Sequence, residues 1–334
     1  MKWYPWLSAP YRQILARYQQ ERGHHALLVH AHAGCGDASL FYAISRWLMC
    51  RQPQGSKSCG HCHSCQLMIA GNHPDFYQLE VEKGRSSLGV DAVRQVVEAL
   101  YGHAQQGGAK VIWLANSELL TEQAANALLK TLEEPPEHTF FLLGCREPSR
   151  LLSTLRSRCL YWHLPAPDEQ SGLYWLGQQG GQEPTAALTA LRMHYGAPLA
   201  ALELLEPARW AERNALCDGL QRAVVNQDFI ALLPLISKDK DDAPLHWLLS
   251  LLTDALKWQQ GAFAFAINQD KPELLQLLAA AFPAGTLHHQ LHQWLDCRRQ
   301  WREITGVNRE LLLVNQLLNW ESDTPDGRAH PWTL

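Results

Sequence analysis

The sequence Ala-Leu-Leu-Val-His-Ala-His-Ala-Gly-Cys-Gly-Asp-Ala, residues 26–38, decides the fold of this chain. A short apolar run leads into a glycine-containing loop, and a stretch with helical spacing follows. Strand, glycine loop and helix in this order are typical of a phosphate-binding loop, whose pattern is G-x-x-x-x-G-K-[ST]. Residues 31–38 therefore predict such a loop, with Gly34 and Gly36 inside it.

Two side chains that a working loop needs are replaced. Asp37 stands where the lysine would reach the phosphates, and Ala38 leaves no hydroxyl for magnesium. The strand that should end in acidic metal ligands ends in Ala115 and Asn116 instead. Two separate losses indicate an NTPase-like chain that does not turn over nucleotide. An unrelated α/β domain is the alternative, but it leaves the two glycines between strand and helix unexplained.

The region from residue 26 to residue 164 alternates short apolar runs with helical patterns, which predicts a parallel sheet with helices on both faces. One predicted helix starts at the N-cap Thr121 and stops before Pro135 and Pro136. The five runs that predict strands are 26–30, 76–81, 111–115, 139–144 and 159–164.

The remainder of the chain, after a linker at 165–168, is predicted to be helical throughout. Proline and glycine punctuation in residues 168–207 indicates three short helices. Longer amphipathic stretches follow at 245–258, 271–282, 287–304 and 309–320.

Composition and charge restrict the function further. The net charge is −4, which argues against a free-standing nucleic-acid binder, so any DNA contact should be local or shared. The N-terminal residues lack the pattern of a secretory signal, and no long apolar run suggests a membrane span. We expect a cytoplasmic protein, in which clustered cysteines indicate metal rather than disulfides.

Four cysteines, Cys50, Cys59, Cys62 and Cys65, follow the predicted loop helix with the spacing C-x8-C-x2-C-x2-C. Four thiolates give the closed shell of structural zinc, so the spacing predicts one Zn2+ per chain. Reduced thiols without metal and a redox pair are the alternatives, and His61 or His63 could substitute as ligands. The other cysteines, which we expect to be small buried apolar residues, are Cys35, Cys145, Cys159, Cys217 and Cys297.

Arg158 lies in Ser157-Arg158-Cys159, between a short predicted helix and a strand. A guanidinium at such a junction can be presented to a neighbouring subunit, where it would stabilise a transferring phosphoryl group. Taken alone, a surface arginine is more often solvated or paired.

The stretch from Asn126 to Pro136, Asn-Ala-Leu-Leu-Lys-Thr-Leu-Glu-Glu-Pro-Pro, together with Ser157-Arg158-Cys159, resembles the bacterial clamp-loader branch of AAA+ proteins. The cysteine insert and the lost lysine are similar to those of a non-hydrolysing subunit of that branch. The ATP-hydrolysing members share the zinc module and the Ser-Arg-Cys motif, but they carry an intact Lys-Thr and an acidic pair.

The resemblance implies three domains: an AAA+-like α/β domain at 1–166 with the zinc module at about 50–65, a helical lid at 167–207, and a helical collar for oligomerisation at 208–334. It further implies a subunit of the DNA polymerase III holoenzyme, associated with the nucleoid, that helps to load the sliding clamp onto primed DNA. No ATP is expected on this chain. Arg158, with Ser157 and Cys159, would supply an arginine finger to a neighbouring ATPase subunit.

The implied partners are gamma/tau ATPase subunits and a delta subunit in a hetero-pentameric ring. Two other functions are weighed against this one. An active ATPase with an unusual site would require nucleotide affinity in the isolated chain, which Asp37 opposes. A stand-alone zinc-bearing nucleic-acid module would need basic and aromatic neighbours, and between Cys50 and Cys65 only Arg51 and Lys57 carry fixed positive charge.

Overall fold

The computed structural model describes residues 1–81, 85, 87–181, 183–238, 242–304, 306 and 308–323. The chain divides into two compact units, Met1–Pro167 and Asp168–Leu334, and each is described by itself. Within the part that the structure describes, no helix is both long and apolar enough to cross a membrane.

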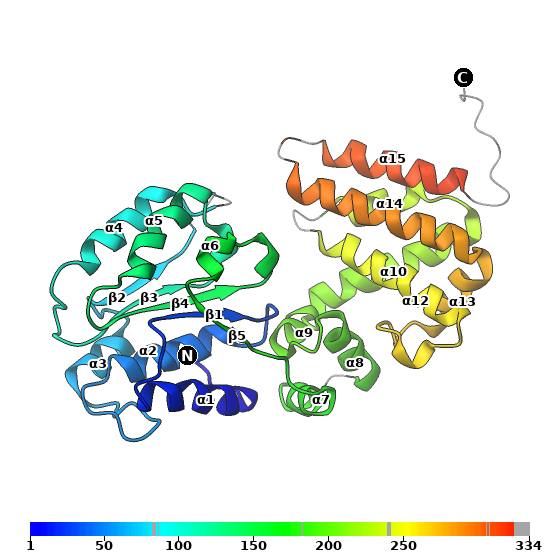
Figure 1. Ribbon diagram of the computed structural model, residues 1–334. Helices are drawn as coiled ribbons and strands as arrows, with labels where there is room; N and C mark the ends of the chain where they lie inside the picture. The colour runs from blue at the N-terminus through cyan, green and yellow to red at the C-terminus, as the bar shows by residue number, and fades with distance from the viewer. Residues whose placement is uncertain are drawn as a thin grey trace. The chain divides into compact units, whose positions relative to one another are not determined.

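The first unit is built on a parallel sheet of five strands in the order β2-β3-β4-β1-β5 (Figure 1). Every neighbouring pair is parallel, with Leu28 of β1 opposite Leu143 of β4 on one side and Tyr161 of β5 on the other. The parallel sheet is confirmed, and each predicted strand is present to within two residues at its ends. The strands are β1 Ala26–His30, β2 Phe76–Leu79, β3 Lys110–Leu114, β4 Thr139–Cys145 and β5 Leu160–His163.

Helices cover both faces of this sheet, with α1, α2 and α3 on one side and α4, α5 and α6 on the other (Figure 1). The cap of α5 is the predicted one, because the Thr121 hydroxyl accepts a hydrogen bond from the Ala124 amide at 3.2 Å. Helix α1 was not predicted. The helices are α1 Ser8–Gln19, α2 Asp37–Leu48, α3 His63–Ala70, α4 Val90–Leu100, α5 Glu122–Glu133 and α6 Ser153–Arg156, with short 3-10 helices at Pro5–Leu7, Ser117–Leu119 and Pro148–Arg150.

The core of the unit lies between the sheet and its helices. Leu28, Ile112, Phe141 and Leu143 are at most 1% exposed, and Leu128 of α5 packs in the same cluster. Burial of one such side chain contributes roughly 1.5–3 kcal/mol. This packing fixes the carboxyl ends of the central strands β1 and β4, where loops carry the residues of the candidate site.

The regular structure in the described part of the second unit is all helical, as predicted. The three short helices expected in residues 168–207 are present as α7 Glu169–Gly177, α8 Pro184–Met193 and α9 Pro198–Leu204. The longer helices follow, and α10 was not predicted because its apolar residues are spread around the helix axis. They are α10 Pro207–Asn226, α12 Ala243–Gln259, α13 Pro272–Ala281, α14 Ala284–Glu303 and α15 Arg309–Ser322, with the short α11 Leu233–Ile236 and 3-10 helices at Ile230–Leu232 and Phe263–Phe265 between them.

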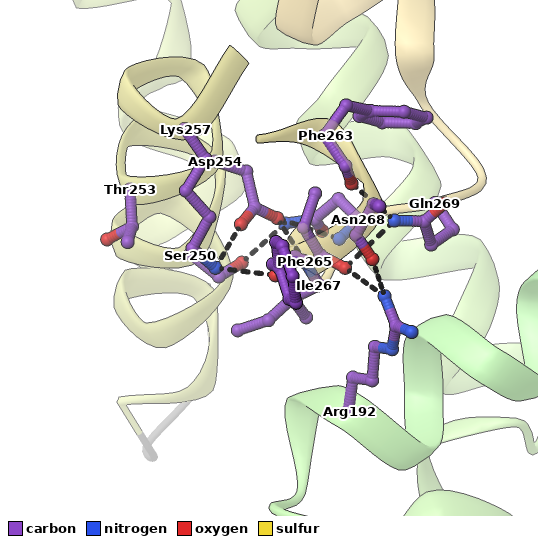
Figure 2. A network of polar contacts seen from close by, with 12 residues as sticks. Arg192, Ser250, Thr253, Asp254, Lys257, Phe263, Phe265, Ile267, Asn268 and Gln269 are labelled. Carbon is purple, nitrogen blue, oxygen red and sulfur yellow. Dashed lines mark hydrogen bonds and ion pairs between the residues drawn. The ribbon is translucent and has the colours of Figure 1, made fainter. Parts of the chain in front are cut away.

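A polar network joins three segments inside this second unit (Figure 2). Asp254 of α12 is fully buried and accepts hydrogen bonds from the backbone and the side-chain amide of Asn268, each at 2.7 Å. From α8, the Arg192 guanidinium donates to the carbonyls of Ala264 and Ala266, at 2.9 and 2.8 Å. The loop between α12 and α13 is therefore hydrogen-bonded to α12 and to α8. The finer division of this unit into a lid and a collar stays a prediction.

Candidate functional site

The loop after β1 has the shape of a phosphate-binding loop. Gly34 and Gly36 have φ angles of 86° and 85°, in the left-handed region that glycine adopts most readily. Gly36 is the N-cap of α2, which begins at Asp37, so the helix predicted after the loop is present. Ala38 is exposed in the first turn. The backbone thus turns sharply from strand to helix, which is the geometry that presents amide groups to an anion in a working loop.

Asp37 is turned into an internal ion pair. Its carboxylate is 2.9 Å from the Arg146 guanidinium, and the residue is only 5% exposed. Arg146 follows β4, and it also donates to the carbonyl of Ala31 at 3.1 Å. The guanidinium therefore spans the loop, from its first residue to the start of α2, and the positive charge there is already neutralised by Asp37.

Aromatic residues from the N-terminal segment pack against the same loop. A Cβ atom placed on Gly36 would lie 2.8 Å from the Tyr4 ring, so the ring is in direct contact with that glycine. Tyr4 stacks on Trp6, with ring centroids 5.2 Å apart, and the Trp6 indole donates to the carbonyl of Cys35 at 2.7 Å. Protein side chains thus contact the loop at its second glycine and at the preceding carbonyl.

The two residues that directly follow β3 carry no carboxylate, and the next carboxylate along the chain, that of Glu118, accepts a hydrogen bond from the Arg146 amide at 2.9 Å. Ala115 and Asn116 follow the strand directly, and the Ala115 carbonyl approaches β4 so closely that a Cβ on Gly144 would lie 2.3 Å from its oxygen. The strand ends are therefore packed at a distance that only glycine permits at residue 144. The two positions after the strand therefore hold an apolar methyl group and an amide.

The four predicted zinc ligands come together. The sulfur atoms of Cys50, Cys59, Cys62 and Cys65 all lie within 4.8 Å of one another, and those of Cys59 and Cys65 are 4.0 Å apart. Zinc–sulfur bonds of about 2.3 Å in a tetrahedron place the sulfurs about 3.8 Å apart, so the arrangement is compatible with a zinc site. His61 is not needed as a ligand, because four sulfurs complete a tetrahedral shell, and its Nδ1 lies 3.0 Å from the Cys59 carbonyl.

Hydrogen bonds and burial make the four thiols unequal. Burial opposes ionisation of Cys62, but backbone amides of Cys65 and Arg51 outweigh it and lower the pKa of Cys62 to about 6. Burial raises the pKa of Cys65 to about 12, and it raises the pKa of Cys50 as well. Neighbouring thiolates repel one another, so a bound dication is what would allow all four sulfurs to ionise together.

Arg158 lies between α6 and β5, and its guanidinium is paired within the chain. Its Nε is 2.6 Å from the Glu133 carboxylate at the end of α5, and its NH1 donates to the Thr154 carbonyl at 2.8 Å. Ser157 is exposed, with its hydroxyl donating to Thr154. The Arg158 side chain is 31% exposed, so it reaches solvent while it is held by Glu133.

The expectation for the scattered cysteines is confirmed at Cys35, Cys145, Cys217 and Cys297, which are buried, and wrong at Cys159, which is only half-buried. Cys159 comes just before β5, an edge strand, so one side of it lacks a neighbouring strand. Burial still raises the pKa of its thiol to about 12.

Comparison with known proteins covers nearly the whole chain. The family model described as "DNA polymerase III, delta subunit" matches residues 8–168, "DNA polymerase III subunit delta', AAA+ ATPase lid domain" matches residues 167–206, and "DNA polymerase III, delta subunit, C terminal" matches residues 207–322. DNA polymerase III subunit delta' of Yersinia pestis is 56% identical, over 98% of both chains. The subunit delta' of Escherichia coli K12 is 50% identical, over 99% of both chains.

The chain belongs to the DNA polymerase III subunit delta' family. It is thereby related to the clamp-loader proteins of DNA replication, and its AAA+ α/β domain with helical lid and C-terminal regions agrees with the predicted fold class. A tau/gamma subunit of Haemophilus influenzae is 34% identical over 151 residues, which is 45% of this chain and 22% of that subunit.

The sequence analysis did not identify several residues that are distant in the sequence but contact the loop after β1 or Arg158. Arg146, Tyr4 and Trp6 were not singled out, nor was Glu133 as the partner of Arg158. One signal was available for Arg146, because an arginine directly after a buried strand lies at the same sheet edge as the loop after β1. The aromatic N-terminal segment gave no comparable signal, since nothing in its spacing points to the loop.

Proposed function

We propose that this chain is the non-hydrolysing subunit of a DNA polymerase III clamp loader and supplies Arg158 as an arginine finger to a neighbouring ATPase subunit. In this role it helps to load the sliding clamp onto primed DNA, acting as a rigid scaffold in a hetero-pentameric ring with gamma/tau and delta subunits. The lid at 167–207 and the collar at 208–334 would be its second and third domains, and the cytoplasm, where replication takes place, its location.

The Asp37–Arg146 ion pair is the observation that carries the non-hydrolysing part of the proposal. A triphosphate would meet a carboxylate in place of an ammonium group, and the nearby guanidinium is already engaged. Tyr4 contacts the same loop, and neither Ala38 nor Asn116 offers a carboxylate or hydroxyl for magnesium. An active ATPase with an unusual site is disfavoured for the same reasons.

The arginine finger is supported by the position and the chemistry of Arg158. Its guanidinium is half-exposed at a helix–strand junction, and it already holds an anionic oxygen of Glu133 with two of its nitrogens. A phosphate oxygen from a neighbouring subunit would replace that carboxylate oxygen with similar geometry. The exchange requires the guanidinium to leave Glu133, an exposed partner that costs little to release.

The four sulfurs fit Zn2+ held as a structural ion. Cys50, Cys59, Cys62 and Cys65 would be its ligands, and the metal would order a polar loop that buries little apolar surface of its own. Bound there, it would supply cross-linking and no reaction chemistry, because four protein sulfurs leave no open coordination position. The loop thus supports the fold of the first unit rather than a stand-alone nucleic-acid module.

Reconstituted clamp loader containing Arg158→Ala tests the proposal. Arg158→Ala should slow hydrolysis at the neighbouring site by about 10³-fold or more, the effect of an arginine finger in other systems. Arg156→Ala, an exposed arginine two residues away, is the matched control and should leave the rate unchanged. Subunit assembly is measured in parallel by gel filtration. Full ATPase activity of an assembled Arg158→Ala complex would refute the finger.

A further inference from the structure

A cavity of about 350 Å³ opens on the first unit beside α2, and no role described above uses it. Four segments converge on it: the N-terminal residues, α1, one face of α2, and the loop that carries the cysteines. That volume lies at the lower end of the about 300–1,000 Å³ typical of small-ligand sites. Its cationic and aromatic lining consists of Lys2, Trp3, Tyr11, Tyr42, Arg46 and Lys57.

The cavity is positively charged although the chain as a whole carries a net charge of −4. Arg46 and Lys57 contribute fixed cations, and none of the described residues that line the cavity is acidic. Lys57 is exposed, and the Arg46 guanidinium lies over the Tyr42 ring, 5.8 Å from its centroid. Arg46 and Lys57, with no carboxylate among the described lining residues, favour an anionic ligand.

The aromatic walls are held in place by hydrogen bonds. The Tyr11 hydroxyl donates to the Ser56 carbonyl at 2.9 Å, and the Tyr42 hydroxyl donates to the Met68 carbonyl at 3.1 Å. Trp3 packs edge-on against Tyr11, with centroids 5.3 Å apart, and it is 41% exposed. Because their polar atoms are bonded to the protein, these side chains can offer ring surface to a ligand with little loss of side-chain entropy.

We propose that this cavity binds single-stranded DNA, with one backbone phosphate on Arg46, the next on Lys57, and a base stacked on Trp3. Cations beside exposed aromatic rings are the combination by which proteins hold single strands without reading their sequence. An acidic peptide would use the cations, but it would leave the exposed indole without a planar partner. Membership in a DNA polymerase III family favours DNA over RNA as the strand.

This site could not be predicted from the sequence. Between Cys50 and Cys65 there are two fixed cations and no aromatic ring other than the histidines. The rings come from the N-terminal segment, α1 and α2, which the fold brings against the loop at residues 56–58. The inference is independent of the arginine finger, because none of its residues contacts Arg158 in the described contacts.

Binding of a fluorescent oligo(dT) of roughly 16 nucleotides to the full chain tests the proposal, by anisotropy over a range of salt concentrations. Two phosphate contacts predict a log–log salt slope of about −1.4 for a single strand. Arg46→Ala with Lys57→Ala should flatten that slope and weaken binding by about tenfold or more. Trp3→Ala should weaken binding by about 5- to 150-fold, the range for one lost base stack.

The matched control removes the same charge elsewhere on the unit, through the exposed pair Arg22→Ala and Arg94→Ala, and should bind like the unaltered chain. Circular dichroism checks that each variant is folded, and Lys57→Ala alone, at an exposed position, carries the test if Arg46→Ala unfolds the chain. Three results would overturn the proposal: no binding by the unaltered chain, equal losses in the control, or displacement by a poly-glutamate peptide as effective as by unlabelled oligo(dT).

Discussion

Asp37 and Arg146, 109 positions apart in the sequence, form an ion pair at 2.9 Å across the loop that follows β1. The pair joins the first turn of α2 to the end of β4, and Arg146 adds a hydrogen bond to the carbonyl of Ala31. An ion pair therefore stands where a working NTPase would pair its lysine with phosphate. The loop keeps its backbone shape, and the Asp37 carboxylate holds α2 to the end of β4.

A double-mutant cycle on this pair should show strong coupling. Arg146→Ala leaves the Asp37 carboxylate, which is 5% exposed, without its counter-ion, so the free energy of unfolding should fall by about 2–3 kcal/mol. Asp37→Ala should cost less, about 1 kcal/mol, because Arg146 keeps its carbonyl partners and partial solvent contact. The double variant should lose about 1–2 kcal/mol less than the sum, as urea unfolding will measure.

Calorimetry on the same variants tests the proposed lack of nucleotide binding. The isolated chain should show no heat of ATP binding, and Asp37→Ala should show none either, because the lysine and the magnesium-binding hydroxyl stay absent. Micromolar affinity for ATP in the unaltered chain would contradict the proposal directly.

Gly36→Ala should destabilise the chain for two reasons. A side chain at φ of 85° is strained, and its Cβ would meet the Tyr4 ring at 2.8 Å. We expect a loss of about 1–3 kcal/mol from the backbone and more from the collision. Gly55→Ala is the matched control, since its φ is 57° and no atom lies within 4 Å of a Cβ there. If Gly36→Ala lowers the free energy of unfolding no more than Gly55→Ala does, the collision with the Tyr4 ring does not contribute to the loss.

The zinc proposal predicts about one metal ion per chain by elemental analysis. Cys59→Ser with Cys62→Ser removes two of four thiolates, so the metal should be lost and the first unit destabilised. Cys297→Ala, a buried cysteine of the second unit, should keep the metal. Unchanged zinc content in the double variant would refute the ligand assignment.

Local patterns in the sequence were sufficient for the elements whose causes are local. The N-cap Thr121, the prolines after α5 and the apolar run of β1 each act within a few residues, and each gave the observed element. The cysteine cluster could also be predicted, because its four residues lie within 16 positions of one another in the sequence. Helix α10 lacked a single apolar face, so periodicity did not find it.

Long-range partners could not be read in the same way. The replacement of lysine by Asp37 was visible in the sequence, but its pairing with Arg146 depends on the strand order that sets β1 beside β4. Likewise, the sequence placed Arg158 at a helix–strand junction but did not identify Glu133 as its partner. Each of these contacts joins residues that only the assembled sheet brings together.

Lowering the pH should weaken the second unit through His194, at the end of α8. Burial, and then the nearby His246, lower the pKa of His194 from 6.5 to about 4. The unfolded chain takes up a proton near pH 6.5 while the folded chain resists until about pH 4, so stability is complete above pH 6.5 and falls between these values. The loss should reach at most about 3 kcal/mol.

Urea unfolding at pH 7 and pH 5 checks this dependence. His194→Gln should reduce the difference between the two pH values, whereas His292→Gln, an exposed histidine on α14, should not. His246 shares the site, and burial lowers its pKa too. A pH dependence that is the same in His194→Gln and in the unaltered chain would exclude His194 as its source. The charged groups around His246 are Asp242, Arg298 and Arg302.

Arg213 of α10 should be the most sensitive charged residue of the second unit. It is fully buried, it binds both carboxylate oxygens of Asp270 at 2.7 and 2.9 Å, and it donates to Asn268 at 2.6 Å. Asp270 also accepts from Thr189 of α8 at 3.0 Å, so this ion pair connects α8 with α10. A scaffold that transmits force between segments 168–206 and 207–322 would need such a connection.

Arg213→Met keeps much of the side-chain volume but leaves Asp270 without its counter-ion in a buried site, which should cost about 3–5 kcal/mol. Arg222→Met, an exposed arginine on the same helix, should change the free energy of unfolding by less than about 0.5 kcal/mol. Restoring the balance with Asp270→Asn in the Arg213→Met background should recover part of the loss, because the remaining amide carries no charge to solvate. If the double variant is no more stable than Arg213→Met, the cost lies in packing against Trp210, whose ring centroid is 4.7 Å from the guanidinium, and not in the ion pair.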